Sequence, residues 1–252
     1  MRPEPNLRPA DPAQAKRQRW LVLTAFALGA LTLLFLLLAQ PALYLRMADG
    51  LRWRLGLPAL AQIDYEQRLA LAQQRGESQA GPCAVLLFGD SHLQGLPGSA
   101  LGAEVSNFAI AGEPAERLAQ RIVAYSSVKQ SRHIVLLSGA NDLVTGRSAA
   151  QTAASLSAVL AQIPATTTVS LLGLPPSTQP ARPALNAALQ ALCTARPGCS
   201  FVSLEALGDG LGALSPELAA TDGIHLSAAG YGRLAVAIQA DLPKHAQCAH
   251  ST

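Results

Sequence analysis

Two segments of the sequence contain residue types that could together perform nucleophilic catalysis. Ser91 lies in the segment FGDSH at 88–92, and Asp222 and His225 lie in the segment DGIH at 222–225. A serine hydroxyl is a weak nucleophile until a neighbouring base accepts its proton, and histidine is the most frequent base. A carboxylate close to the histidine can orient the imidazole and stabilise its charged form. These residue types predict attack by Ser91, with His225 as the base and Asp222 as its partner.

Two further segments contain groups that can hold negative charge. Gly112 lies in the segment AGE at 111–113, and Asn141 lies in the segment GAND at 139–142. The backbone N–H groups of Ser91 and Gly112 and the side-chain amide of Asn141 are suitable donors to an oxyanion. A glycine at position 112 also lets the backbone come close to a substrate. Each segment alone is typical of a turn or a helix cap, so the prediction requires all four to meet.

The elements that would bring the four segments together can be predicted from hydrophobic periodicity. Short apolar runs alternate with segments of helical spacing. The runs predict strands at 83–89, 105–112, 133–139, 168–174 and 200–204, and the spacing predicts helices at 114–127, 149–163, 183–195 and 227–242. Such alternation predicts a three-layer α/β/α sandwich of the flavodoxin-like kind, with a five-stranded parallel sheet. Ligands of such sheets bind outside the carboxyl ends of the strands, which is where the four segments lie.

Taken together, the four segments resemble those of the SGNH/GDSL hydrolase family. FGDSH matches the block of the nucleophile, Gly112 and GAND match the two middle blocks, and DGIH followed by LSAAGY matches the last block. The resemblance covers roughly residues 83 to 242. It implies a serine esterase that works through an acyl-enzyme. Its catalytic triad would be Ser91, Asp222 and His225, and its oxyanion hole would be formed by Ser91, Gly112 and Asn141.

His92 departs from the better-known members of this family, which have leucine at that position. Family branches that act on O-acetylated carbohydrates often have histidine there. The resemblance therefore implies the removal of O-acetyl or other short acyl groups from a cell-envelope or extracellular carbohydrate. A lysophospholipase, a thioesterase or an acyltransferase would use the same triad, and a non-catalytic envelope protein could retain the fold. A flavodoxin-like nucleotide binder is disfavoured, since residues 89–92 offer a carboxylate where phosphate-cradling glycines are needed.

Several residues next to these segments are expected to have roles outside the triad and the oxyanion hole. Asp90 is expected to cap a helix or a turn rather than to take part in catalysis. Glu113, Glu116 and Arg117 follow the oxyanion glycine, and they either line the substrate groove or form an ordinary solvated helix start. The proline-rich loop 174–183 follows a strand and is expected to overhang the site.

Composition excludes several functional classes. The 252 residues are 50% hydrophobic and only 14% charged, which suits a well-buried core, and a net charge of +3 without a basic stripe gives little support to nucleic-acid binding. His133 is expected at the amino end of a strand, and His245 and His250 lie in a tail. We therefore expect neither a metal nor a cofactor. The oligomeric state stays open.

The N-terminal region predicts attachment to a membrane. Residues 21–39 carry no charge and as a helix span roughly 28 Å, close to the hydrocarbon thickness of a bilayer. We expect a cytoplasmic tail at 1–19 and a transmembrane helix at 20–40; a cleaved signal peptide is the alternative. Basic residues favour a cytoplasmic N-terminus in the inner membrane and a periplasmic catalytic domain, with Arg2, Arg8, Lys16, Arg17 and Arg19 before the span and Arg46, Arg52 and Arg54 after it.

The remaining segments complete the predicted organisation. Residues 41–80 are expected to form amphipathic juxtamembrane helices or a linker, which either lie at the bilayer surface or form a stalk. The hydrolase domain is expected at 81–245 and a C-terminal tail at 246–252. The four cysteines are expected to pair as Cys193–Cys199 and Cys83–Cys248 at the amino-end face of the sheet, and four unpaired thiols are the alternative.

Overall fold

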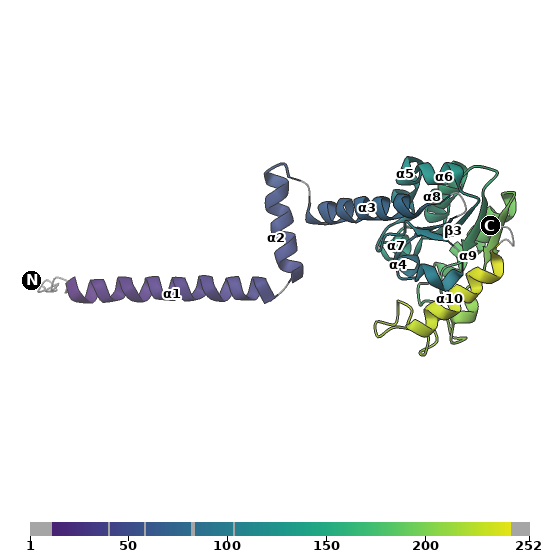
Figure 1. Ribbon diagram of the computed structural model, residues 1–252. Coiled ribbons are helices and arrows are strands. Elements are labelled where there is room, and N and C mark those ends of the chain that lie inside the picture. The colour runs from purple at the N-terminus through teal and green to yellow at the C-terminus, as the bar shows by residue number, and fades with distance from the viewer. Residues whose placement is uncertain (1–11, 40, 58, 82–83, 103, 243–252) are drawn as a thin grey trace, which may run out of the picture. The chain divides into compact units, whose positions relative to one another are not determined.

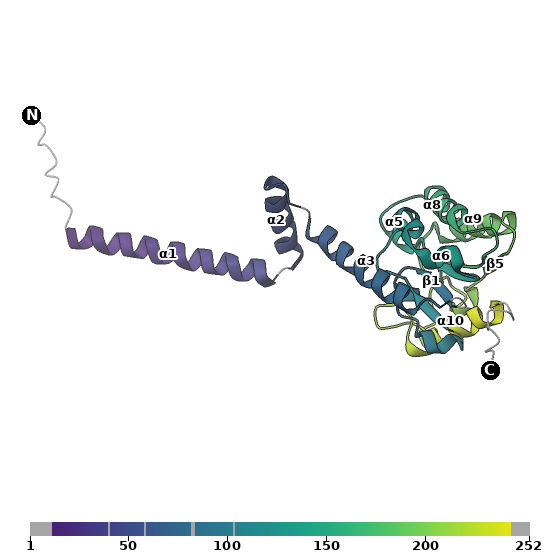
Figure 2. The same ribbon diagram turned by 45° about the horizontal axis from the view of Figure 1, so that its top comes forward.

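The structure is a computed structural model that describes residues 12–39, 41–57, 59–81, 84–102 and 104–242 (Figure 1 and Figure 2). The chain divides into two compact units, Met1–Glu66 and Gln67–Thr252. Helix α3 (Leu60–Gln79) begins in the first unit and ends in the second.

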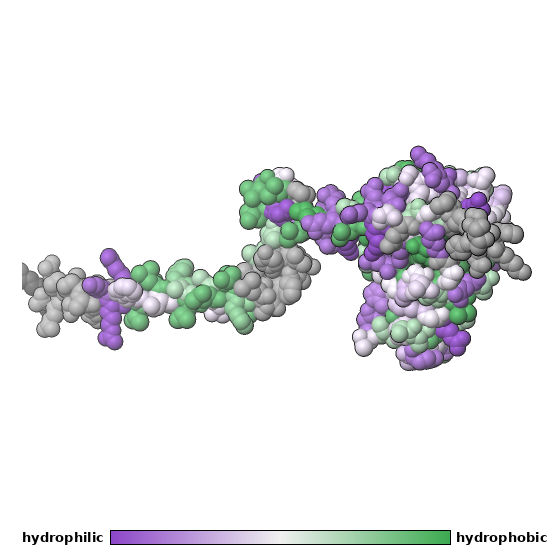
Figure 3. All heavy atoms as spheres, viewed as in Figure 1, coloured by the Kyte–Doolittle hydropathy of each residue, from purple (hydrophilic) through white to green (hydrophobic). Residues whose placement is uncertain are grey.

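The first unit is helical. It contains α1 (Pro12–Ala39), α2 (Pro41–Arg54) and the first turns of α3. The segment Lys16–Leu36 of α1 has a mean hydropathy of 1.9 and contains no buried residue, and hydrophobic residues cover most of it (Figure 3). Its length and composition suit either a membrane span or a signal peptide. Asp49 of α2 accepts a hydrogen bond from the backbone N–H of Leu60 at 2.7 Å, which ties the start of α3 to α2.

The second unit is built on a five-stranded sheet in the order β2-β1-β3-β4-β5, and every neighbouring pair of strands is parallel. This confirms the predicted fold class, since the order is that of flavodoxin-like sheets. The strands are β1 (Val85–Gly89), β2 (Val105–Asn107), β3 (His133–Leu137), β4 (Thr168–Leu172) and β5 (Cys199–Val202). Every residue of β1 and β3 is buried, as expected of strands that are covered on both faces.

Helices cover both faces of the sheet. Figure 2 shows α5, α8 and α9 on one side and α10 on the other. Two of the longer helices start at side-chain caps, since Ser148 and Gln151 form a capping box at α8 and Ser227 caps α10. The helices are α4 (Ser91–Gln94), α5 (Ala115–Arg121), α6 (Ser126–Gln130), α7 (Ala140–Val144), α8 (Ala149–Gln162), α9 (Arg182–Ala195) and α10 (Ala228–Asp241), with shorter 3₁₀ turns η1 (Gly98–Leu101), η2 (Ile122–Ala124) and η3 (Glu205–Leu207).

Two elements differ from the sequence-based prediction. The strand expected at 105–112 ends at Asn107. The N–H groups of Phe108 and Ile110 nevertheless donate to backbone carbonyls of β1. The helix expected at 114–127 is interrupted after Arg121. The side chain of Arg121 is drawn into the core, and Tyr125 takes an extended backbone conformation before α6 begins.

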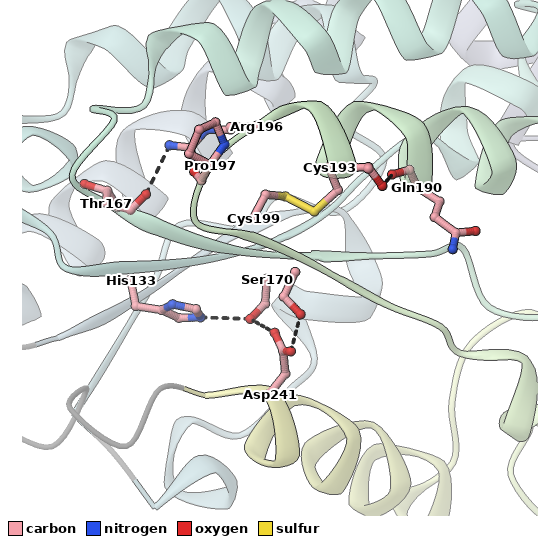
Figure 4. Close-up of a disulfide and its surroundings, with 11 residues drawn as sticks. His133, Thr167, Ser170, Gln190, Cys193, Arg196, Pro197, Cys199 and Asp241 are labelled. Carbon is pink, nitrogen blue, oxygen red and sulfur yellow. Dashed lines mark hydrogen bonds between the residues drawn. A yellow bond between two sulfur atoms is a disulfide. The ribbon is translucent and has the colours of Figure 1, made fainter.

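One of the two predicted disulfides is present. Cys193 near the end of α9 is bonded to Cys199 at the start of β5, with a Cα–Cα distance of 5.1 Å (Figure 4). The bridge lies at the amino end of β5, as the fold predicted. Cys83 and Cys248, the other predicted pair, lie outside the described residues.

Candidate active site

Ser91 is positioned by a sharp turn between β1 and α4. Gly89 ends the strand, and a Cβ atom at this position would overlap the backbone carbonyl of Leu137 on β3. Asp90 then caps α4, because its Oδ1 accepts a hydrogen bond from the backbone N–H of His92 at 3.1 Å. This hydrogen bond confirms the capping role expected for Asp90, whose side chain is fully buried. Ser91 is the first residue of α4 and lies outside the carboxyl end of β1.

The structure brings Ser91, His225 and Asp222 together. The Nε2 atom of His225 lies 3.0 Å from the Oγ atom of Ser91, and its Nδ1 atom lies 2.6 Å from Oδ2 of Asp222. These residues come from segments that are more than 130 positions apart in the sequence. The order hydroxyl–imidazole–carboxylate is the arrangement that activates a serine.

The turn that carries His225 is held by Asp222 itself. Its Oδ1 atom accepts hydrogen bonds from the backbone N–H groups of Ile224 and His225, both at 2.9 Å. The hydrogen bond from the His225 side chain, together with these backbone N–H groups, holds the pKa of the Asp222 carboxyl well below its usual value. The carboxylate is therefore ionised throughout the neutral range, although 47% of its side chain is exposed.

The donors predicted for an oxyanion lie on segments that contact one another. The side-chain oxygen of Gln94, on the same helix as Ser91, accepts the backbone N–H of Ala111. The side-chain amide of Asn141 in α7 donates to the carbonyl of Glu113 at 3.2 Å. Gly112 lies between these two contacts and has a φ of +76°, which favours glycine. The segments of Ser91, Gly112 and Asn141 therefore meet at one edge of the sheet.

His92 joins the segment of Ser91 to the segment of His225. Its Nδ1 lies 3.2 Å from Oδ1 of Asp90, and its Nε2 lies 3.2 Å from the carbonyl oxygen of Ile224. Burial lowers the pKa of His92, but the hydrogen bond and the charge of Asp90 outweigh this effect and raise the pKa above its ordinary value. In the sequence, His92 indicated only a class of substrate, and no pattern predicted its contacts with Asp90 and Ile224.

A pocket of about 190 Å³ lies beside Ser91 and His225. The proline-rich loop expected to overhang the site forms one wall of it, and residues adjacent to Ser91 and His225 form another. Its lining is mostly apolar and consists of His92, Ala140, Leu143, Val144, Leu174, Pro175, Pro176, Ser177, Thr178, Gln179, Ala213, Gly223 and Ile224. Such a pocket can accept a small apolar group.

Glu113 neither lines a groove nor faces solvent, so both readings of its role from the sequence are wrong. It is 1% exposed, and Arg121 donates to both of its carboxylate oxygens at 2.6 Å. The same arginine donates to the hydroxyl of Tyr125 at 2.7 Å and to the carbonyl of Phe108 at 2.8 Å. A buried and fully bonded pair of this kind fixes the loop that contains Gly112. No spacing in the sequence indicated Arg121 as the partner.

Three further charged residues near the site connect the helix of Asn141 to the start of α5. Glu116 pairs with Arg147 at 2.7 Å on the surface. Arg147 also lies 3.2 Å from the buried carboxylate of Asp142, which accepts the backbone N–H of Ala115 at 2.8 Å. Burial raises the pKa of Asp142 above its ordinary value. These contacts tie α7, which carries Asn141, to the start of α5.

No three metal-binding side chains stand together among the residues that the structure describes. His133 lies at the amino end of β3, away from the candidate site, as the sequence predicted. His245 and His250 lie outside the described residues.

Comparison with known proteins identifies a family for most of the second unit. Residues 86–233 match the model of the GDSL-like lipase/acylhydrolase family. This segment contains the four segments described above. No curated protein matches the chain.

Solved structures of low sequence identity share the fold. A protein from Streptococcus pneumonia that is described as a platelet activating factor superposes with a TM-score of 0.60 and 24% identity, over 74% of this chain and 100% of that chain. A lipase/acylhydrolase from Enterococcus faecalis gives 0.54 and 22%, over 63% and 94%. The psychrotrophic esterase EstA from a Pseudoalteromonas species gives 0.50 and 16%, over 62% and 93%.

Proposed function

The chain belongs to the GDSL-like lipase/acylhydrolase family and is an ester hydrolase, and on this premise we propose that Ser91, His225 and Asp222 are its catalytic triad. The observation that carries the proposal is the 3.0 Å separation between Nε2 of His225 and Oγ of Ser91. This is hydrogen-bonding distance for a base that accepts the serine proton. The 2.6 Å contact of Asp222 with the opposite ring nitrogen supports the role of its carboxylate in selecting the reactive tautomer.

The reaction proceeds in two halves. In the first, His225 takes the proton of Ser91 while Oγ bonds to the ester carbonyl carbon, and the imidazolium then gives this proton to the departing alcohol. In the second, His225 takes a proton from water, the water oxygen bonds to the acyl carbon, and the proton returns to Ser91 as the acid leaves. Asp222 stays ionised in both halves, which its lowered pKa favours.

The negative charge that develops on the carbonyl oxygen is held by an oxyanion hole. We assign this role to the backbone N–H groups of Ser91 and Gly112 and to the side-chain amide of Asn141. One N–H of this amide donates to the carbonyl of Glu113, and the other remains for the substrate. Removing one such donor typically costs about 2.7–4 kcal/mol of transition-state stabilisation.

The substrate that the site suits best is a short acyl ester of a carbohydrate, above all an O-acetyl group of a cell-envelope or extracellular glycan. The pocket of about 190 Å³ beside Ser91 is apolar, and it is small for a long acyl chain. The side chains of His225 and Asp222 are 44% and 47% exposed, so a bulky alcohol such as a glycan can approach them.

The proposed subcellular location is the inner membrane, which the protein crosses once with its N-terminus in the cytoplasm. In this proposal residues 1–19 form the tail, residues 20–40 cross the bilayer, residues 41–80 link the membrane to the enzyme, residues 81–245 form the periplasmic hydrolase domain, and residues 246–252 are a C-terminal tail. The apolar helix α1 supports the span. The disulfide of Cys193 and Cys199 supports the exported domain, because such bonds persist in oxidising compartments.

A second candidate substrate is a lipid or thioester with a longer acyl chain. The observation that favours it is the pair Val144 and Ile224, which line the pocket while 69% and 65% exposed. An alkyl chain that extends out of the pocket would cover these side chains. Acyl transfer to a second sugar would use the same acyl-enzyme.

The test is hydrolysis of graded esters by the purified full chain in detergent. 4-Nitrophenyl acetate, butyrate and octanoate are compared with an O-acetylated glycan, using the wild type, Ser91→Ala and, as the matched control, the exposed serine variant Ser99→Ala. We expect the highest kcat/KM for acetate, release of acetate from the glycan, and activity in Ser99→Ala but not in Ser91→Ala. Equal rates in Ser91→Ala and the wild type would refute the assignment of the nucleophile. A preference for octanoate would refute the proposed substrate class alone.

A further inference from the structure

Helix α3 reaches the loop that contains Gly112 through one charged side chain. Arg68 is half-buried, and its Nη1 atom donates a hydrogen bond to the carbonyl oxygen of Ala111 at 2.7 Å. Arg68 lies 43 positions from Ala111 in the sequence, ahead of the residues that match the family model. Neither the family match nor the sequence motifs assign it a role.

The acceptor of this hydrogen bond belongs to the peptide group that contains the N–H of Gly112. A trans peptide group is planar, so its C=O and N–H point in opposite directions and turn together. Arg68 therefore restrains the direction of the Gly112 N–H by holding the carbonyl of Ala111. Within the described part of the chain, no acceptor for the Gly112 N–H is present, which leaves this donor for a ligand.

The preceding peptide group is held from the other side. The N–H of Ala111 donates to the side-chain oxygen of Gln94, which lies one turn after Ser91 on α4. Arg68 and Gln94 thus hold Ala111 at its carbonyl and its N–H. The donor of Gly112 is therefore fixed relative to the segment of Ser91.

The charge of Arg68 also acts on the strength of the donor. A charge-assisted hydrogen bond to a carbonyl is stronger than a neutral one. It polarises the peptide group and makes the N–H on its opposite side a better donor, and this cooperativity increases in a site of low dielectric constant. The effect is largest when an oxyanion forms, so it lowers the barrier more than it strengthens substrate binding.

The docking of α3 does not depend on Arg68 alone. Arg75 donates to the carbonyl of Asn107 at 3.2 Å, and Glu77 accepts hydrogen bonds from the hydroxyls of Ser126 and Ser127 at 2.6 and 2.8 Å. Gly76 packs against the ring of Phe108. None of these contacts involves Arg68, so α3 should keep its position when Arg68 is replaced. A change in activity of an Arg68 variant then reflects the altered peptide group and not a displaced helix.

From these contacts we propose that Arg68 is a positioning residue of the esterase, which orients and polarises the Ala111–Gly112 peptide group for the oxyanion. The proposal rests on the function proposed above, in which Gly112 donates to that oxyanion. It makes the middle of α3 a working part of the active site, although this part of the chain precedes the matched family segment.

The experiment compares three variants of the full chain in detergent with 4-nitrophenyl acetate. Arg68→Met removes the donor and the charge but keeps a long side chain, Arg68→Lys keeps the charge, and Arg75→Met is the matched control on the same helix. We expect Arg68→Met to lower kcat about tenfold with KM nearly unchanged, less than the 10²–10³-fold typical of removing a whole donor. Arg68→Lys should recover most of this loss, and Arg75→Met should keep the wild-type kcat.

A second readout separates positioning from a merely structural role. A trifluoromethyl ketone forms a hemiketal oxyanion with the serine, so its inhibition constant should rise in Arg68→Met by the same factor by which kcat falls. The proposal is overturned if Arg68→Met keeps the wild-type kcat, or if Arg75→Met loses as much activity as Arg68→Met. If Ser91→Ala is as active as the wild type, the proposed triad fails instead.

Discussion

At the scale of single residues, the carboxylate of Asp222 has two structural functions at the proposed site. One oxygen of Asp222 accepts the backbone N–H groups of Ile224 and His225, and the other lies against the imidazole of His225. The first contact shapes the turn, and the second orients the base. A substitution that keeps one function and removes the other can therefore separate the two contributions.

Asp222→Asn is that substitution. The two backbone N–H groups should bind the amide oxygen in the place of Oδ1, which forces the NH₂ group toward Nδ1 of His225. The imidazole must then accept at Nδ1 and carry its proton on Nε2, where it can no longer take the proton of Ser91. We expect kcat to fall about 10⁴-fold, as for the wrong tautomer in other serine hydrolases, while the midpoint of thermal unfolding changes little. A kcat within tenfold of the wild type would contradict this role of Asp222.

At the scale of elements, the part of α3 that belongs to the second unit is held to the rest of that unit by a close contact as well as by its charged residues. Gly76 is buried against Phe108, whose ring stacks on Phe88 at 4.8 Å and meets the edge of Tyr125 at 4.7 Å. This aromatic cluster lies beneath the chain that leads to Gly112. The small size of Gly76 therefore lets α3 come close to this loop.

We predict that Gly76→Ala destabilises the protein, although alanine is the better helix former by about 1 kcal/mol. The added Cβ would overlap the Phe108 ring, and overpacking of this kind costs about 1–3 kcal/mol. Urea unfolding and kcat should therefore both show a loss. Gly232→Ala is the control, because a Cβ at this position in α10 meets nothing within 4 Å and should leave stability equal or slightly higher. Stabilisation by Gly76→Ala would show that α3 does not pack as described.

Helix α10 is held to the sheet by a partly buried polar network at the opposite end from the site. Nε2 of His133 lies 2.9 Å from the hydroxyl of Ser170, which donates to the carboxylate of Asp241, and Ser200 donates to the same carboxylate (Figure 4). Burial lowers the pKa of His133 to about 4, although the charge of Asp241 acts in the opposite direction. The imidazole is therefore neutral in the folded protein at neutral pH.

The pH dependence of unfolding follows from this lowered pKa. In the unfolded chain the imidazole takes up its proton near pH 6.5, whereas in the folded protein it does so only near pH 4. Between these values the unfolded state binds more protons, so the free energy of unfolding should fall as the pH is lowered from about 6.5 to about 4. Urea unfolding at a series of pH values should show a shallower fall in His133→Gln than in the wild type. Parallel curves for the two proteins would exclude His133 as the cause.

At the scale of the whole molecule, the proposed topology predicts the location of the C-terminus. A reporter enzyme that is active only outside the cytoplasm should be active when fused after Thr252 and inactive when fused after Arg19. Carbonate extraction should leave the full chain in the membrane fraction, because a helix such as Lys16–Leu36 favours hydrocarbon. Release of a shortened protein into the soluble fraction would show that α1 is a signal peptide instead.

The sequence was sufficient to predict the sheet and the residues that meet at its edge, because both depend on local patterns. Buried strands such as Val85–Gly89 are continuous apolar runs, and the polar residues after them must gather at one edge of a parallel sheet. The contacts that support this edge could not be predicted in the same way. Arg68 and Arg121 resemble solvated helix residues in the sequence, and their partners are a backbone carbonyl and a distant carboxylate that have no periodic signal.

Arg68 lies within α3, which is one continuous helix from Leu60 to Gln79. The position of a proteolytic cut relative to this helix therefore decides whether the released enzyme contains Arg68. If α1 anchors the protein in a membrane as proposed, a cut between Arg54 and Leu60 should free a diffusible esterase that retains Arg68 and its activity. A cut after Gln79 should free one that lacks this arginine and, if the proposed role of Arg68 is correct, turns over more slowly. Cleavage before α3 and cleavage after it would thus release the hydrolase with and without Arg68, at two points separated by the 20 residues of the helix, roughly 30 Å along its axis.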